Sequence, residues 1–184
     1  MSFLFIFLSC NNGKHLKFNG IEIDGNITKF ISKMEKKGYT NIGMEGNNYA
    51  MSGIFCDEEC IIEIETTKKT NPEVVYAVTV MFPPKYNWDN LKSDYNSIKK
   101  NISKKYKAEG KSLETFISPY YEGDRSELMA LATSHCIYMT TWSLKNGAII
   151  LMITTERRIL LAYSDKINIT LDGVENDKQF MKDI

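Results

Sequence analysis

Cysteine and histidine are the most chemically versatile side chains in this 184-residue sequence, which contains four cysteines and two histidines. Cys56 and Cys60 lie between two predicted strands, where facing positions of a hairpin have a Cα separation that suits a disulfide. Cys136 lies in a later predicted strand, so a Cys60–Cys136 bridge would tie two halves of a sheet together. In an oxidised protein we favour Cys60–Cys136 slightly over Cys56–Cys60, and both pairings stay open.

The same three cysteines and His135 would supply four ligands of the type that zinc prefers. However, consecutive strand residues point to opposite faces of a sheet, so His135 and Cys136 do not easily share one ion. The C-x₃-C spacing also lacks the second spaced pair that such zinc sites use. The sequence therefore predicts neither a metal site nor a cofactor.

Groups that could converge for catalysis are few. Glu63 and Glu65 share one face of a predicted strand and could form a carboxylate pair, and His135 could act as a general base. The sequence contains no G-x-S-x-G, P-loop, G-x-G-x-x-G or H-E-x-x-H motif. An enzyme of unrecognised type is therefore an alternative hypothesis, and its remaining candidate residues are Glu122 and Asp124.

The segment Ser118–Asp124, with the sequence SPYYEGD, is the most distinctive loop. Tyr120, Tyr121, Glu122 and Asp124 could form a binding lip, with the rings stacking on a sugar or a peptide. The alternative interpretation is that one tyrosine closes the edge of the core and the acids form the turn. The loop is nevertheless our candidate binding site.

Two helices should position these residues. The first is predicted over 27–37, with Asn26 as its N-cap and Gly38 as its stop. The second begins after Asn87, ends at Gly110, and carries six lysines on a predicted solvent face. Its predicted apolar stripe consists of Trp88, Leu91, Tyr95, Ile98, Ile102 and Tyr106.

Runs of alternating or β-branched residues predict strands after each helix. An Asn146-Gly147 pair between two of these runs is a strong hairpin signal. The pattern predicts an α+β fold, with an antiparallel sheet, two helices packed on one face, and two α-β-β-β-like halves. The predicted strands cover residues 49–55, 60–66, 74–82, 127–132, 136–142, 147–153 and 159–163.

Composition is that of a single globular domain, with 43% hydrophobic and 25% charged residues. The 23 basic and 23 acidic side chains balance, so no overall field favours nucleic acid or an anionic membrane. We therefore expect no nucleic-acid partner, and a membrane contact only through a lipid anchor.

The N-terminal segment could supply that anchor. Phe3–Leu8 is a short apolar run, and Leu8-Ser9-Cys10 resembles the box at which bacterial lipoproteins are cleaved and lipidated at cysteine. We interpret residues 1–14 as a truncated signal and tether, 15–166 as one α+β domain, and 167–184 as a polar tail. The alternative is that Phe3–Leu8 is a core strand, which would make the protein cytoplasmic.

Several short stretches together carry a resemblance: His15–Ile21, Lys37-Gly38-Tyr39, Cys60-Ile61-Ile62, Lys105-Tyr106, Pro119–Asp124 and Tyr163-x-Asp165-Lys166. In these stretches the sequence resembles an uncharacterised family of small exported proteins and lipoproteins from gut bacteria. The resemblance implies export to the cell envelope, in the periplasm or anchored at the outer membrane. It implies no functional residues.

Good core patterning without a convergent catalytic set favours a non-enzymatic binding or interaction module of the cell envelope, exported or lipid-anchored at Cys10. Its expected partner is a protein, a peptide or a glycan. The alternatives are the carboxylate-based enzyme and an oligomeric structural component that pairs through exposed strand edges.

Overall fold

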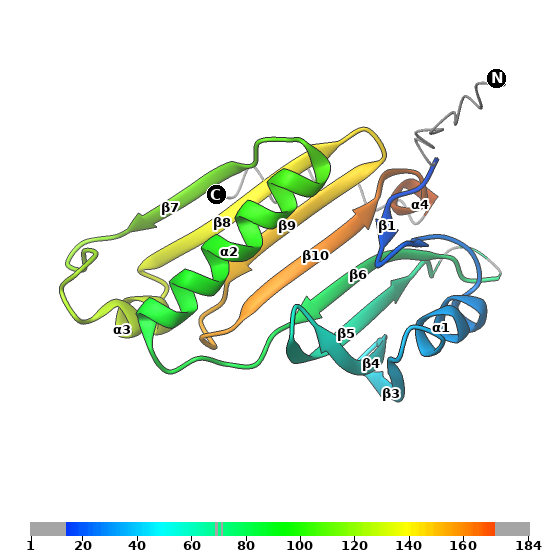
Figure 1. Ribbon diagram of the computed structural model, residues 1–184, viewed down its shortest axis with the longest axis horizontal. Helices are drawn as coiled ribbons and strands as arrows, with labels where there is room; N and C mark the ends of the chain where they lie inside the picture. Colours follow the sequence, from blue (N-terminus) through cyan, green and yellow to red (C-terminus); the bar gives the residue numbers. More distant parts are fainter. Residues whose placement is uncertain (1–13, 69, 71, 172–184) are drawn as a thin grey trace, which may run out of the picture.

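The computed structural model describes residues 14–68, 70 and 72–171. These residues form an antiparallel sheet of eight strands in the order β3-β4-β5-β6-β10-β9-β8-β7, and a separate ladder of β1 and β2 (Figure 1). The predicted α+β class with an antiparallel sheet is confirmed, although the described residues contain four helices rather than two. The helices are α1 (Ile27–Glu35), α2 (Trp88–Tyr106), α3 (Glu127–Ala132) and α4 (Lys166–Leu171). The strands are β1 (Lys17–Phe18), β2 (Ile21–Glu22), β3 (Thr40–Glu45), β4 (Asn48–Phe55), β5 (Glu58–Thr66), β6 (Val75–Met81), β7 (Lys111–Phe116), β8 (Cys136–Leu144), β9 (Gly147–Ile153) and β10 (Ile159–Asp165).

The strand order is symmetric about the pairing of β6 with β10. Each half consists of a helix followed by four strands, α1 with β3–β6 and α2 with β7–β10, and α3 is inserted between β7 and β8. The predicted strands do not include β3 or β7, the first strand of each half. All six residues of β3 and five of the six in β7 are exposed, so these edge strands lack the alternation that burial imposes.

The segment Glu127–Ala132 differs from its predicted secondary structure. Residues 127–132 were predicted as a strand, but they form the helix α3. Glu, Leu, Met and Ala are strong helix formers, and the buried Ala130 and Leu131 are enough to fix a short helix against the end of β8. Residues 166–171, at the start of the predicted polar tail, form α4.

The predicted start of α2 is confirmed, but its predicted stop is wrong. The Asn87 side chain accepts a hydrogen bond of 3.0 Å from the Asn90 N–H, as an N-cap should. At the other end Lys107, not Gly110, adopts the left-handed conformation that ends the helix, with φ of 51°. Gly110 is required by packing instead, because a Cβ there would lie 2.7 Å from Cε2 of Trp142.

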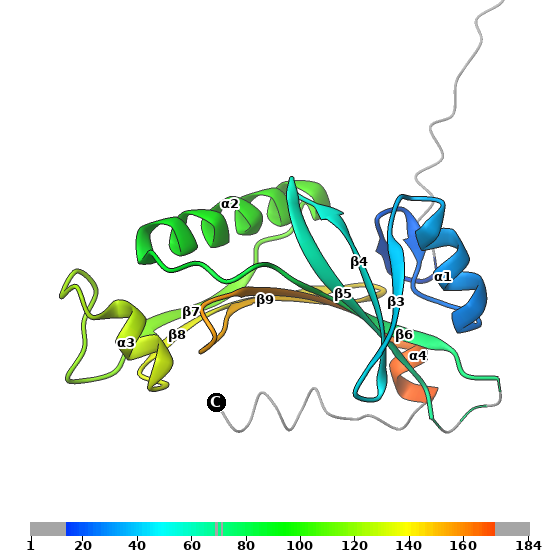
Figure 2. The same cartoon turned by 90° about the horizontal axis from the view of Figure 1, so that it is seen from below.

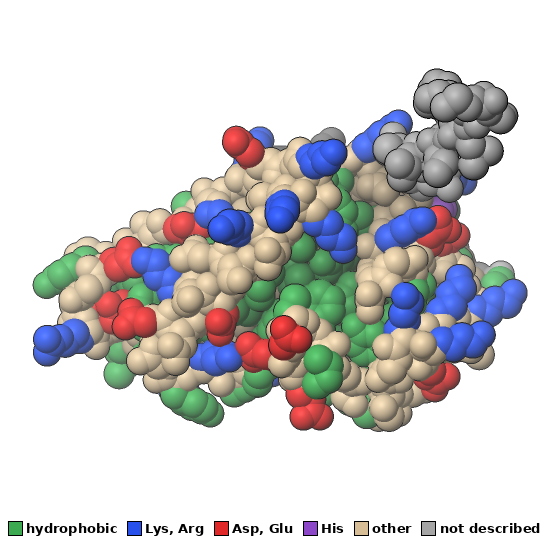
Figure 3. Space-filling model, viewed as in Figure 1, with side chains coloured by type: hydrophobic (Ala, Val, Ile, Leu, Met, Phe, Trp, Pro, Cys, Tyr) green, Lys and Arg blue, Asp and Glu red, His purple; other side chains and the backbone are tan. Residues whose placement is uncertain are grey.

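The buried apolar side chains of the sheet and of α1 and α2 belong to one hydrophobic cluster. In β10, Ile159, Leu161 and Tyr163 are buried and the residues between them are only partly covered. This period of two indicates that the strand packs one face on the core. Figure 2 shows α2 lying over β8 and β9 on that side of the sheet, and Figure 3 shows lysine side chains along the outer surface of α2.

The first described residues are held to the end of β10 by a buried polar network. Asp165 is 0% exposed and accepts hydrogen bonds from the N–H groups of Leu16 at 2.8 Å and of Ile167 and Asn168 at 3.0 Å. His15 Nδ1 lies 3.2 Å from Oδ1 of the same carboxylate. The Asn168 side chain donates in turn to oxygen atoms of Ile23, Asp24 and Val75.

Candidate functional site

A pocket of about 670 Å³ opens at one end of the sheet. Its walls are Tyr86–Asp89, at the start of α2, and Gly123 with Arg125–Met129, from the loop before α3 and from α3 itself. We call it the end pocket. The two walls are far apart in the sequence, but the start of α2 and α3 lie together at the left end of Figure 1.

The first wall is fixed to the turn between β9 and β10. The Pro83-Pro84 pair follows the last residues of β6, because proline cannot donate to a sheet. Next, the Lys85 N–H donates to the Arg157 carbonyl at 2.8 Å. The Arg157 guanidinium lies 4.7 Å from the centre of the Tyr86 ring, a cation–π distance, and Tyr86 is 72% exposed. The arrangement therefore holds a large aromatic ring in solvent.

The base of the end pocket rests on a cluster of aromatic rings. Trp88 is buried and meets Phe116 and Tyr138 edge to face, with ring centres 5.6 Å and 5.1 Å apart. Burial raises the pKa of Tyr138 to about 12, so its hydroxyl is neutral at physiological pH. This cluster gives the pocket a rigid, uncharged base.

The second wall is the end of the loop 117–126, which we call the tyrosine loop. Asp124 shapes its turn, because its carboxylate accepts hydrogen bonds from the Tyr121 N–H at 3.1 Å and the Ser126 N–H at 2.7 Å. Glu127 accepts a further bond of 2.8 Å from the Gly123 N–H. The geometry therefore supports the alternative interpretation for Asp124, in which its carboxylate forms the turn and does not bind a ligand.

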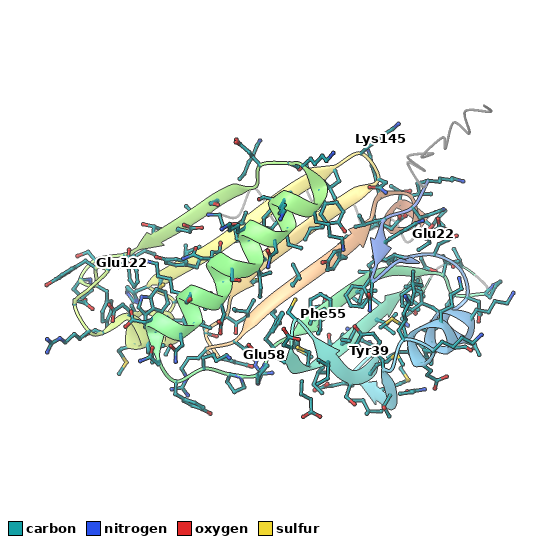
Figure 4. The ribbon with its side chains drawn as sticks, viewed as in Figure 1. Glu22, Tyr39, Phe55, Glu58, Glu122 and Lys145 are labelled. Atoms are coloured by element: carbon teal, nitrogen blue, oxygen red, sulfur yellow. The ribbon has the colours of Figure 1, made fainter. Side chains whose placement is uncertain are left out.

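The other predicted residues of the tyrosine loop lie around the pocket. The Tyr120 ring packs 5.4 Å from the His135 ring, and Tyr121 is 66% exposed at the loop tip. Glu122, labelled at the left end of Figure 4, binds the Lys92 ammonium and accepts a 3.4 Å hydrogen bond from Tyr138. The described residues that line the end pocket include none of the four predicted binding residues. They do include the chain neighbours Gly123, Arg125 and Ser126.

The end pocket combines apolar and polar groups. Tyr86 and Met129, which is 58% exposed, supply apolar surface. Asp89 and Glu127 supply carboxylates that accept hydrogen bonds, and Arg125 supplies a guanidinium that donates them. Such a surface can stack on a ligand and bind its polar groups, which is how specific ligand pockets are built.

The carboxylates proposed for an enzyme do not converge. Glu63 and Glu65 lie on β5, and β8, which follows His135, is four strands away, or about 19 Å. Their carboxylates accept hydrogen bonds from Asn48 at 3.3 Å and Tyr76 at 2.8 Å. His135 has its Nδ1 2.7 Å from the Thr133 carbonyl oxygen, and in Figure 4 Glu122 lies far from Glu58 at the start of β5.

Neither predicted disulfide is present, and the three cysteines in the described part of the chain are free. Cys56 occupies a two-residue turn with φ of 51°, between Phe55 and Glu58 in Figure 4, while Cys60 faces Gly53 across the ladder. The turn is therefore shorter than predicted, and Cys56 does not face Cys60. Cys136 lies four strands from Cys60, too far for a bridge. Burial raises the pKa of Cys60 and Cys136 to about 12.

No helix in the described part of the chain has the length and apolar character needed to cross a membrane. No group of three or more His, Cys, Asp or Glu side chains in residues 14–68, 70 and 72–171 is arranged to hold a metal ion. Cys10, the predicted lipidation site, lies outside the described residues.

Comparison of the chain with protein-family models, with curated proteins and with solved structures gave no match.

Proposed function

We propose that this protein is a non-enzymatic binding module that takes an oligosaccharide in the end pocket. The observation that carries the proposal is the exposed Tyr86 ring, held in place beneath Arg157, at the rim of a pocket with two carboxylates. The C–H face of a sugar ring stacks on an aromatic side chain, and its hydroxyl groups donate to carboxylates and accept from a guanidinium. The same pocket would accept a short peptide less well, because most of its lining residues other than Tyr86, Trp88, Leu128 and Met129 are polar or charged.

The fold supports a binding role over catalysis. The pocket is placed on a rigid aromatic base, while the acids considered for catalysis lie in opposite halves of the sheet. We also infer that α1 and α2 back the same face of the sheet, since their buried side chains belong to one cluster. The module would then consist of two helix-backed halves with the end pocket at one end.

A glycan array followed by calorimetric titration of the best glycan tests the proposal. Tyr86→Ala should weaken binding at least about tenfold, which corresponds to 1.4 kcal/mol. Tyr121→Ala is the matched control, because Tyr121 is similarly exposed but does not line the end pocket, and it should change affinity less than about twofold.

Loss of binding in Tyr121→Ala alone would move the site to the tip of the tyrosine loop. If no glycan binds, but a library screen yields peptides whose binding depends on Tyr86, the ligand of the end pocket is a peptide and not a sugar. If neither ligand class binds, the binding-module proposal fails.

The location at the cell envelope rests on the sequence pattern around Cys10 and on the family resemblance. Mass spectrometry of the mature protein from fractionated native cells tests it. A lipid-modified Cys10 would support an anchored envelope protein, whereas an unmodified Met1 or Ser2 in the cytosol would contradict that location.

A further inference from the structure

The face of the sheet opposite α2 carries a continuous apolar row. Side chains alternate along each strand, so the residues between the core-facing positions of β8, β9 and β10 point to this second face, which we call the open face. Of these, Met139 on β8 is itself buried. The strand registers place one residue from each of six neighbouring strands side by side: Leu113, Met139, Met152, Leu160, Met81 and Ile61.

The open face is flanked by helices but not crossed by one. In Figure 2, α4 lies against it at one end and α3 at the other, and no described element lies between them. Beside α3 the face is hollowed by a pocket of about 390 Å³, whose lining includes Leu131, Ile137, Met139 and Met152. This hollow has the size and the apolar lining to receive one large side chain of a partner.

The other half of the open face is acidic. Glu59, Glu63 and Glu65 alternate along β5 and point to the same side as Ile61. Strands β3–β6 contain no lysine or arginine. The contacts of Glu63 and Glu65 within the described residues are hydrogen bonds from the neutral side chains of Asn48 and Tyr76. The face thus presents an apolar region over β8–β10 and an acidic region over β5.

We propose that the open face binds a cationic amphipathic helix of a partner protein. The apolar side chains of that helix pack on the methionine row, with one inserted in the hollow beside α3, and its lysines or arginines meet the glutamates of β5. Charge complementarity selects this occupant over an anionic one. Three methionines suit the surface to apolar side chains of varied shape, because methionine is flexible and polarizable.

The spacing of the two regions sets the pattern of the partner. Met152 on β9 and Glu63 on β5 are three strands apart, or about 14 Å. A helix that crosses the strands rises about 1.5 Å per residue, so its apolar and basic clusters should be about ten residues apart. This surface is distinct from the end pocket and does not depend on the proposed sugar binding.

A fluorescein-labelled, 18-residue helical peptide of leucine, alanine and lysine, with its leucines and lysines at that spacing, is a direct probe. Fluorescence anisotropy with the full chain should show saturable binding that weakens with salt, and the same peptide with glutamate for lysine should not bind. Glu59→Lys/Glu63→Lys should weaken binding at least about tenfold. Glu35→Lys/Glu109→Lys makes the same change of net charge on exposed residues outside the open face, and should change affinity less than about threefold.

A second pair of variants, one in the apolar region and one outside the open face, tests the apolar contact. Met152→Glu should weaken binding at least about tenfold, whereas Met44→Glu, on the edge strand β3, should not. Circular dichroism and thermal unfolding confirm that each variant is folded before it is titrated.

Three outcomes would overturn the proposal. Equal losses in the two double-lysine variants would mean that only the overall charge attracts the peptide. Tighter binding by a chain that ends at Leu171 would assign the face to residues 172–184 of the same molecule. A dimer in sedimentation analysis that Met152→Glu dissociates would assign it to a second copy.

Discussion

Asp165 is a carboxylate in a place where a charge is expensive, because an unpaired buried ion costs several kcal/mol. It is tolerated because three backbone N–H groups and the His15 ring meet its two oxygen atoms. Two of these N–H groups belong to the first turn of α4, where a carboxylate also interacts favourably with the helix dipole. Asp165 thus ends β10, caps the start of α4 and holds Leu16, the residue before β1, in place.

Asp165→Asn should therefore lower the free energy of unfolding by about 2–3 kcal/mol. The NH₂ group of asparagine replaces one carboxylate oxygen, so it would face backbone N–H donors in place of an acceptor. Urea unfolding followed by circular dichroism measures this. Asp24→Asn is the control, since the Asp24 side chain is 41% exposed and its amide oxygen can still accept from Asn168; it should cost less than about 1 kcal/mol. Equal effects of the two variants would mean that Asp165 is not the centre of the network.

The elements that sequence reasoning predicted well are those that bury one face. The hairpin that Asn146-Gly147 predicted forms between β8 and β9, although its two-residue turn is Lys145-Asn146, one residue earlier. Met51 and Phe55 share a face of β4, as the alternation of residues 49–55 indicates. The edge strands β3 and β7 were not predicted because nearly all of their residues are exposed, so their sequences carry no periodic signal. For α3 the apolar run was too short to distinguish a helix from a strand.

The end of α2 gives a test at the scale of the element. Lys107→Gly should stabilise the protein by about 0.5–1 kcal/mol, because glycine adopts a positive φ without steric cost. Gly110→Ala should destabilise it by about 1–3 kcal/mol, because the added Cβ overlaps Trp142. Thermal unfolding of the two variants measures both changes in stability. A stabilising Gly110→Ala together with a destabilising Lys107→Gly would put the helix end elsewhere.

At the scale of the molecule, the described residues share one hydrophobic core, and that core buries phenol groups. Burial raises the pKa of Tyr138 to about 12 and also raises the pKa values of Tyr95 and Tyr163. In the unfolded chain these tyrosines titrate near their ordinary pKa of about 10. Above that pH the unfolded state binds fewer protons than the folded state, so stability present below pH 10 is lost as the pH rises toward 12.

The free energy of unfolding should consequently fall by about 1 kcal/mol per buried tyrosine between pH 10 and pH 11. Urea titrations at pH 8, 10 and 11 measure the decrease. In Tyr138→Phe the decrease should be smaller by about 1 kcal/mol, since one raised pKa has been removed. A free energy of unfolding that stays constant from pH 10 to pH 11 would contradict the burial of these hydroxyls.

The candidate site also belongs to the scale of the molecule, which is why sequence reasoning found only part of it. The tyrosine loop was identified from its composition, but Tyr86 and Asp89 lie earlier in the chain, before and in the first turn of α2, and carry no motif. They meet Arg125 and Glu127 only because α2 starts at the same end of the sheet at which α3 is placed. Such a meeting depends on tertiary topology, which local patterns do not encode.

The contact between His15 and Asp165 also determines how the domain is presented to its surroundings. Because the first described segment and the end of β10 meet at one corner, chain attached before Lys14 or after Leu171 leaves the domain from the same region. Figure 1 places that corner toward one end of the long axis, and the start of α2 and α3, which line the end pocket, toward the other. A tether at either segment would therefore leave the end pocket pointing outward, at the far tip of the molecule.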